Sequence, residues 1–229
     1  MSAVGTTEHD TDRDHSEFTV IAIDGPAGSG KSTVARRVAE ALDLEYLDTG
    51  AMYRSVTFAV LASGSDPADN PTVAAIARET ELSIAGDGTV VVDGVDATTQ
   101  IRGPEVTRAV SLVADNPDVR AELVSRQREW ARRRNGGVLE GRDIGSVVFP
   151  DSKLKVYLNA SREVRAARRA GEVTELDYDT VAADLARRDA IDTERQHDPL
   201  RRPDGAIEID TSGLTIDEVV AVIIDKLRD

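Results

Sequence analysis

The chain has 229 residues, of which 40% are hydrophobic and 31% charged, a composition typical of a globular protein. The net charge of −14 disfavours a general nucleic-acid binder, so any phosphate chemistry must depend on locally placed cations. The absence of cysteine excludes disulfides and thiolate metal sites. The histidines, His9, His15 and His197, are too scattered to suggest a metal site.

Residues 1–17 are polar and acidic, and they lack the basic start and apolar stretch of a secretory signal. We expect them to form a mobile leader. No apolar run in the sequence is long enough to span a bilayer. We therefore expect a cytoplasmic protein with neither a membrane nor a nucleic acid as partner.

Segments typical of strands and helices alternate along the rest of the chain. The first expected strand, 18–24, is apolar and β-branched and ends at Gly25-Pro26. Further strands are expected at 44–47, 138–140, 154–158 and 207–210, and helices at 31–42, 50–62, 116–134 and from the Thr215-x-x-Glu218 capping box onward. This alternation predicts an α/β sandwich around a parallel sheet.

Residues 81–98 break the alternation. Asp87-Gly88 and Asp93-Gly94 are hairpin-turn signals between short β-prone runs, and the turn-rich segment 63–71 precedes them. We expect a small antiparallel insert here. The basic run 130–134 is interpreted as a solvated helix end rather than a nucleic-acid patch, because the overall charge is negative.

Residues 25–32 match G-x-x-x-x-G-K-[ST] at every fixed position, between an expected strand and an expected helix. Glycines let the backbone aim N–H groups at phosphate oxygens, and the helix start adds partial positive charge. Lys31, one of only four lysines, would reach the β- and γ-phosphates, and Ser32 would hold Mg²⁺. The alternative is a plain glycine-rich turn, which the strand and helix context disfavours.

Other features of the sequence exclude some classes of P-loop protein. No asparagine precedes a lysine, so the guanine-reading Asn-Lys-x-Asp of a switch GTPase is absent. The chain is also compact for a motor or transporter ATPase. A kinase of a small acceptor and a non-catalytic nucleotide-binding regulator remain open.

A second group of polar residues follows the expected strands. The hydroxyl of Thr49 could cap the next helix and face an anion that Arg54 could clamp. Glu140, Arg142 and Asp143 follow a buried strand, at the edge where open α/β sheets bind ligands, and Glu140 could act on Mg²⁺ or its waters. An ordinary capped helix and a turn with a local ion pair are the alternatives.

Arginines recur near the C-terminal third of the chain. Arg188, Asp192 and Arg195 are spaced four and three residues apart and would share one helical face. Spacing alone favours a surface salt-bridge ladder. However, Arg165 belongs to a second arginine cluster, and two arginine-bearing helices flanking 170–179 could form a lid that excludes water.

Four segments together resemble the motifs of bacterial cytidylate kinases, in the family's order. They are Gly-Pro-Ala-Gly-Ser-Gly-Lys-Ser-Thr at 25–33, Leu-Asp-Thr-Gly-Ala-Met-Tyr-Arg at 47–54, Glu-Gly-Arg-Asp-Ile-Gly-Ser-Val-Val-Phe-Pro at 140–150 and Arg-Arg-Asp-x-x-Asp-x-x-Arg at 187–195. The resemblance covers about 18–228. It implies a P-loop NTPase-type three-layer sandwich with a five-stranded parallel sheet, a small antiparallel insert and a helical lid.

The resemblance also implies a domain organisation. Residues 18–229 would form a single kinase domain, and the hairpins at 81–98 resemble part of its nucleoside-monophosphate-binding insert. The core would comprise 18–48, 115–164 and 196–229, the insert about 49–114 and the lid about 165–195. The implied working unit is a monomer that closes around two nucleotides.

The activity implied is transfer of the γ-phosphoryl group of ATP, with Mg²⁺, to CMP or dCMP. The implied catalytic cations are Lys31, Arg142, Arg188 and Arg195, and the metal residues are Ser32 and Glu140. ATP would be bound by Gly25, Pro26, Ala27, Gly28, Ser29, Gly30, Lys31, Ser32, Thr33 and Arg165. The acceptor would be bound by Thr49, Tyr53, Arg54, Ser111, Arg120, Arg142, Asp143, Arg188, Asp192 and Arg195.

By this resemblance Ser111, Arg120 and Asp143 would read cytosine. A carboxylate at Asp143 can accept from the exocyclic amine, and Arg120 can donate to the ring acceptors, so uracil should bind worse. The sequence departs from many nucleotide kinases at Glu140, where Asp is common, and at Ser32, where Gly is common. A P-loop kinase of adenylate, shikimate or a sugar acid is the alternative, although no Asp-Gly-Phe-Pro-Arg segment of the adenylate kinase type occurs.

Overall fold

The computed structural model describes residues 18–172 and 177–228, so the expected leader at 1–17 lies outside the described residues. A five-stranded sheet has the order β2-β6-β1-β7-β8, and every neighbouring pair is parallel. Its strands are β1 (Thr19–Asp24), β2 (Tyr46–Asp48), β6 (Gly136–Gly141), β7 (Leu154–Asn159) and β8 (Ile207–Asp210). The carboxyl ends of these strands therefore share one edge of the sheet.

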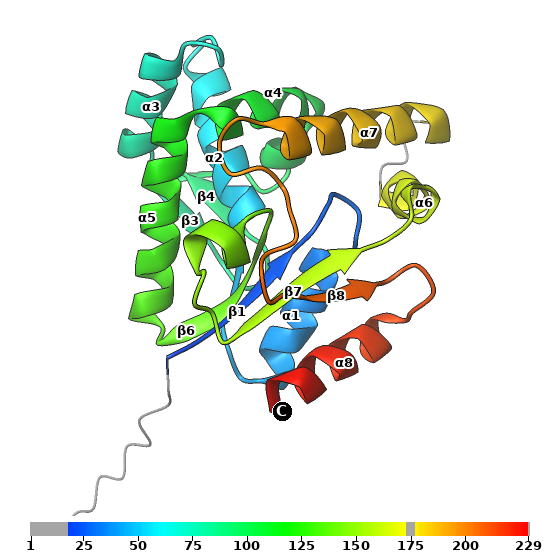
Figure 1. The fold of residues 1–229 in the computed structure, drawn as a ribbon. Helices are drawn as coiled ribbons and strands as arrows, with labels where there is room; N and C mark the ends of the chain where they lie inside the picture. Colours follow the sequence, from blue (N-terminus) through cyan, green and yellow to red (C-terminus); the bar gives the residue numbers. More distant parts are fainter. Residues whose placement is uncertain (1–17, 173–176, 229) are drawn as a thin grey trace, which may run out of the picture.

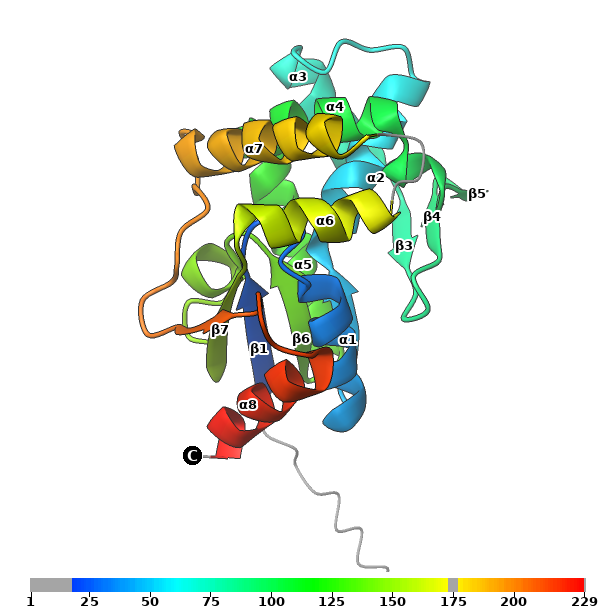
Figure 2. The same ribbon diagram turned by 90° about the vertical axis from the view of Figure 1, so that its right-hand side faces the viewer.

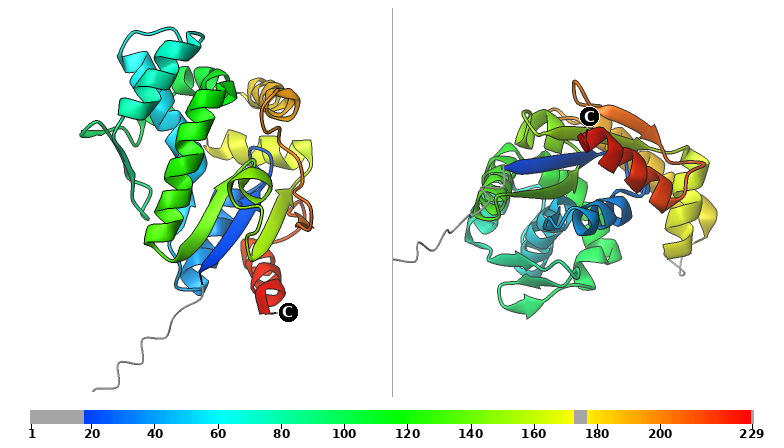
Figure 3. Two further views of the ribbon diagram at one scale, coloured as in Figure 1. Left: turned by 60° about the vertical axis from the view of Figure 1, so that its left-hand side comes forward. Right: turned by 90° about the horizontal axis from the view of Figure 1, so that it is seen from below.

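Helices cover both faces of this sheet (Figures 1 and 3). One face packs against α1 (Lys31–Ala41) and α8 (Ile216–Arg228), and the other against α2 (Thr49–Ala62) and α5 (Pro117–Arg133). Successive strand residues point to opposite faces of the sheet. Ile21 and Ile23 of β1 therefore pack in the apolar cluster on the α1 and α8 face, and Val20 and Ala22 pack in the cluster on the α2 and α5 face. The predicted three-layer sandwich is confirmed.

Six further helical segments are described. They are α3 (Asn70–Glu79), η1 (Gln100–Arg102), α4 (Pro104–Asp115), the π-helical turn η2 (Ile144–Val148), α6 (Arg162–Glu172) and α7 (Tyr178–Glu194). In Figure 2, α6 and α7 cross above the carboxyl ends of the strands. Among the described residues, no helix has both the length and the apolar character needed to cross a membrane.

A second, three-stranded sheet is antiparallel and lies beside α2 (Figure 2). It consists of β3 (Leu82–Ile84), β4 (Val90–Val92) and β5 (Val95–Asp96). The two hairpin turns contain Gly88, Asp93 and Gly94, which have the positive φ values that such turns require. Val90 and Val92 pack against α2 in a small apolar cluster, so the predicted antiparallel insert is confirmed.

Some local expectations differ from the structure. The second strand is Tyr46–Asp48 rather than 44–47, because the amide of Leu44 still donates to the carbonyl of Ala39 at the end of α1. Helix α3 begins at Asn70, inside the segment expected to be turn-rich, because Asp69 caps it and a proline occupies its first turn.

Leu139 of β6 is fully buried in the apolar cluster that joins the sheet to α2 and α5. We expect Leu139→Ala to lower the free energy of unfolding by about 2–5 kcal/mol, because the lost contacts leave a cavity. Leu112→Ala is the matched control, since Leu112 is 48% exposed and should change stability by less than about 0.5 kcal/mol. Urea denaturation would measure both, and equal losses would contradict this core.

Candidate active site

The P-loop lies between β1 and α1, at the carboxyl edge of the sheet. Gly25, Gly28 and Gly30 have φ values of 153°, 75° and 89°, which side-chain-bearing residues rarely adopt. A Cβ on Gly25 would lie 2.1 Å from the carbonyl oxygen of Leu158, so only glycine fits there. The loop backbone is thus free to turn its amides toward a ligand at the start of α1.

Lys31 is buried at the start of α1, and its Nζ donates to the carbonyl oxygen of Pro26 at 2.7 Å. Burial, reinforced by the charge of Arg142, lowers the pKa of Lys31 to about 7. A phosphate would be a stronger partner than this carbonyl and would restore the charged ammonium.

Glu140 lies next to the last residue of β6, and its carboxylate accepts a hydrogen bond from the hydroxyl of Tyr46 at 2.7 Å. Burial and the nearby charge of Asp48 raise the pKa of Glu140, while Lys31 and the hydroxyl of Ser32 act in the opposite direction. Hydroxyl and carboxylate oxygens are the ligands that Mg²⁺ prefers, so this pair fits that ion. Residues 18–172 and 177–228 contain no cluster of three metal-ligating His, Asp or Glu side chains, which a phosphate-bound Mg²⁺ does not require.

Arginines from different parts of the chain form a cationic cluster in the lining of one cavity; they are Arg54, Arg142, Arg169 and Arg188. Burial and the charges of Arg188 and Arg169 lower the pKa of Arg54 to about 9. Burial and the charge of Arg142 lower the pKa of Arg188 to about 10, and Nε of Arg188 is buried without a hydrogen-bond partner. Such crowding is unfavourable in the free protein, so the cluster favours binding of an anion.

One carboxylate, that of Asp192 on α7, accepts from Nε of Arg142 at 2.8 Å. Burial alone would raise the pKa of Asp192, but Arg142 outweighs it and the pKa is lowered. Burial alone would lower the pKa of Arg142, but Asp192 outweighs it and that pKa is raised. The ion pair therefore joins the end of β6 to α7.

A third group lies between α2, α4 and α5. Arg120 and Asp143 form a buried ion pair, and the guanidinium carbon of Arg120 lies 5.8 Å from the ring centroid of Tyr53. Arg195 lies 3.7 Å from the carboxylate of Asp143, and Ser111 lines the same cavity. Paired donors and acceptors on a planar, partly apolar surface are suited to reading a base edge.

These groups share one cavity of about 890 Å³. The sequence-predicted residues that line it are Ala27, Gly28, Gly30, Lys31, Ser32, Thr33, Thr49, Tyr53, Arg54, Ser111, Arg120, Glu140, Arg142, Asp143, Arg188, Asp192 and Arg195. Gly25, Pro26 and Ser29 shape the loop behind the lining. The residues predicted to bind the phosphoryl donor, the acceptor and the acceptor's base therefore line the same cavity, although they are far apart in the sequence.

One expectation about an individual residue is wrong. Asp48, rather than Thr49, caps α2, and the hydroxyl of Thr49 donates to the carbonyl of Glu140 at 2.6 Å. Arg195 is the C-cap residue of α7, and its amide still donates to the carbonyl of Ile191 at 3.0 Å, so it continues the face of Arg188 and Asp192, as their spacing predicted. All three residues line the cavity.

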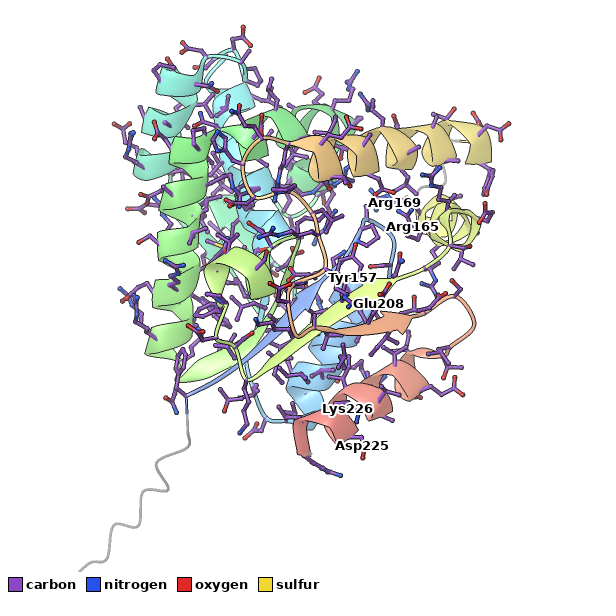
Figure 4. All side chains as sticks on the ribbon, in the orientation of Figure 1. Tyr157, Arg165, Arg169, Glu208, Asp225 and Lys226 are labelled. Carbon is purple, nitrogen blue, oxygen red and sulfur yellow. The ribbon has the colours of Figure 1, made fainter. Side chains whose placement is uncertain are left out.

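Arg165 does not line the cavity. It is 5% exposed, donates to the carbonyls of Ala160 and Ala27, and pairs with Asp189 at 2.6 Å. It therefore braces the P-loop from behind. Arg168 and Arg169 of the same helix line the cavity instead, and Figure 4 shows the P-loop side of α6, with Arg165 and Arg169 labelled.

Sequence reasoning also missed lining residues. Asp48 and Arg102, whose charged groups lie 3.9 Å apart, belong to the lining, as does Thr211, which accepts from Arg168. The arginine cluster at 165–169 was a signal for Arg168. Asp48 lies inside the motif at 47–54, whereas nothing in the sequence distinguished Arg102 or Thr211 from surface positions.

A P-loop between strand and helix, with a second cationic cluster across one cavity, defines a P-loop phosphotransferase. A family model described as cytidylate kinase matches residues 21–229. The chain belongs to the cytidylate kinase family.

Relatives support this assignment along nearly the whole chain. The cytidylate kinase of Streptomyces avermitilis is 44% identical over 214 residues, which cover 92% of this chain and 93% of the relative. The cytidylate kinase of Geobacillus kaustophilus is 48% identical over 216 residues, covering 91% and 96%. A gluconokinase structure from Sinorhizobium meliloti has a TM-score of 0.51 at 15% identity, covering 93% of each chain, and shows the shared fold alone.

The crowding of cations predicts an unusual stability change. Arg188→Gln removes a buried charge that burial and Arg142 disfavour, so we expect the free energy of unfolding of the free protein to rise by on the order of 1 kcal/mol. Arg187→Gln is the control, because that side chain is 53% exposed and pairs with Asp184 on the surface. Chemical denaturation would measure both, and a marked loss of stability in Arg188→Gln would contradict the repulsion.

Proposed function

We propose that this chain transfers the γ-phosphoryl group of ATP to CMP or dCMP, giving ADP and CDP or dCDP. The observation that carries the proposal is that the P-loop lysine, a second arginine cluster and the Arg120–Asp143 pair line one cavity in a member of the cytidylate kinase family. A nucleotide-binding regulator would need only the first of these. Nothing in the cavity favours a different acceptor.

On the donor side, the P-loop amides and Lys31 would bind the phosphates of ATP. Lys31 would leave the carbonyl of Pro26 and neutralise charge that develops between the β- and γ-phosphates. Ser32 and Glu140 would hold Mg²⁺, directly or through water, and that ion would supply charge neutralisation when bound. The hydrogen bond from Tyr46 keeps the carboxylate of Glu140 oriented toward the loop.

On the acceptor side, no general base is needed. The acceptor phosphate has a second pKa near 6 and is mostly dianionic at neutral pH, so its oxygen is already a nucleophile. Two anionic phosphates must nevertheless approach in line against Coulomb repulsion. Arg54, Arg142, Arg188 and Arg195 would offset this repulsion and align the groups, with the hydroxyl of Thr49 beside them.

The base site would distinguish cytosine from uracil. Asp143 would accept from the exocyclic amine of cytosine, while uracil presents a carbonyl to that carboxylate. Arg120 and Ser111 would contact the ring acceptors, and Tyr53 would lie against the base. Asp192 would contact the acceptor sugar from α7.

We extend the proposal to the parts that move. The elements within about 49–114 would close on the acceptor, the helices within 165–195 would act as a lid, and 18–48, 115–164 and 196–229 would form the fixed core. The contact of α7 with both α6 and α4 supports closure as a unit. One chain supplies every group named above, which supports a monomer as the working unit. The proposed reaction belongs to pyrimidine nucleotide metabolism, and we propose that the protein acts in the cytoplasm.

A coupled assay of ADP release tests the reaction. With ATP and Mg²⁺, we expect CMP and dCMP to be rapid acceptors, UMP to be slower and AMP to give little turnover. Lys31→Met should lower kcat by at least about 100-fold with an unchanged fold, because it removes a cation aimed at the transferred group. ADP release only with another acceptor would contradict the base site, and ATP binding without transfer to any acceptor would contradict the enzyme.

Proton uptake tests the electrostatics of Lys31. With its pKa lowered to about 7, most Lys31 side chains are neutral at pH 8, and bound phosphates would restore their charge. Binding of MgATP at pH 8 should therefore be accompanied by proton uptake, and the uptake should fall as the pH drops below 7. Calorimetry in buffers of different ionisation enthalpy measures it. Equal uptake in Lys31→Met would contradict this origin.

A further inference from the structure

Asp198 lies in the segment between α7 and β8, outside every motif identified in the sequence. Its carboxylate accepts from Nε of Arg120 at 2.8 Å. Its carbonyl oxygen accepts from the guanidinium of Arg195, with Nε at 2.6 Å. One residue therefore contacts both the base-reading arginine and an acceptor-side arginine.

The guanidinium of Arg120 has two acidic partners. Its side chain is 4% exposed, with Asp143 on one nitrogen and Asp198 on another. Burial of this cation is unfavourable, but Tyr53, Asp143 and Asp198 outweigh it, and the pKa of Arg120 is raised. Removal of the carboxylate partners of such a buried arginine is strongly unfavourable, because it leaves an uncompensated charge.

The two carboxylates have different tasks when a base enters. Under the proposed function, the Asp143 carboxylate must turn at least partly from Arg120 to the exocyclic amine of cytosine. Arg120, whose side chain is 4% exposed, would then lose a counter-ion at a considerable cost. The Asp198 carboxylate contacts a different nitrogen and can stay in place.

The backbone conformation around Asp198 fixes the position of its side chain. Its φ is 49°, in the left-handed region, which Asp and Asn adopt more readily than other side-chain-bearing residues. Nearby, the amide of Leu200 donates to the carbonyl of Asp192 at 2.7 Å, which ties the segment to the end of α7. The carboxylate is therefore held against Arg120 by local structure rather than by chance.

We propose that Asp198 is a positioning residue for base recognition: its carboxylate holds Arg120 and so frees Asp143 to accept from the amine of cytosine. The inference rests on the proposed function. It predicts that loss of the Asp198 charge ties Asp143 more tightly to Arg120. Recognition of the amine then weakens, whereas a uracil nucleotide, which lacks that amine, loses less.

Asp198→Asn is the sharpest variant, because asparagine keeps the shape and the left-handed backbone but removes the charge. We expect KM for CMP to rise about tenfold, with a smaller change in kcat and no change in KM for ATP. The ratio of kcat/KM for CMP to that for UMP should fall at least about threefold. Asp204→Asn is the matched control, because Asp204 is exposed on the same segment and it is its backbone carbonyl, not its carboxylate, that accepts from Lys155 of β7.

The outcomes separate the two proposals. If the unchanged protein does not phosphorylate CMP, the proposed function itself is wrong. If it does, an unaltered CMP:UMP ratio in Asp198→Asn, or equal losses for both acceptors and for ATP, would overturn the role of Asp198. Thermal denaturation of both variants and the unchanged protein, expected within about 2 °C, excludes general unfolding as the cause.

Discussion

The ion pair between Arg142 and Asp192 is the interaction on which the site depends. It joins the carboxyl end of β6, beside the P-loop, to the helix that carries Arg188, with Nε and the carboxylate 2.8 Å apart. Each partner alone would be costly to bury, yet each shifts the pKa of the other toward the charged form. The pair thereby holds donor and acceptor sides of the cavity together, and its charges remain in place to meet phosphate.

The same constraint explains how a protein with a net charge of −14 can bind two polyanions. Cations outnumber carboxylates in the lining of the cavity, and burial lowers the pKa values of Lys31, Arg54 and Arg188. Repulsion between these buried cations therefore destabilises the free protein, and ligand phosphates would relieve it. The site thus lowers the stability of the fold but provides the preorganised positive charge that phosphoryl transfer requires.

Local sequence patterns predicted the sandwich, because the β1–P-loop–α1 unit has its own strand, turn and helix signals. They missed α4, although Val106, Val110 and Val113 recur at helical spacing. Within the site, residues inside motifs were predicted, but contacts between distant segments were not. Arg165 braces the P-loop instead of lining the cavity, and Asp198 reaches Arg120 across 78 positions of sequence, which no local pattern records.

Donor and acceptor would lie together in one cavity. A compound in which adenosine and cytidine are joined through five phosphates tests this arrangement most directly, by calorimetry in the presence of Mg²⁺. We expect it to bind at least about 100-fold more tightly than ATP, because one molecule would fill the P-loop, the arginine cluster and the base site at once. Binding no tighter than that of ATP would contradict a shared cavity.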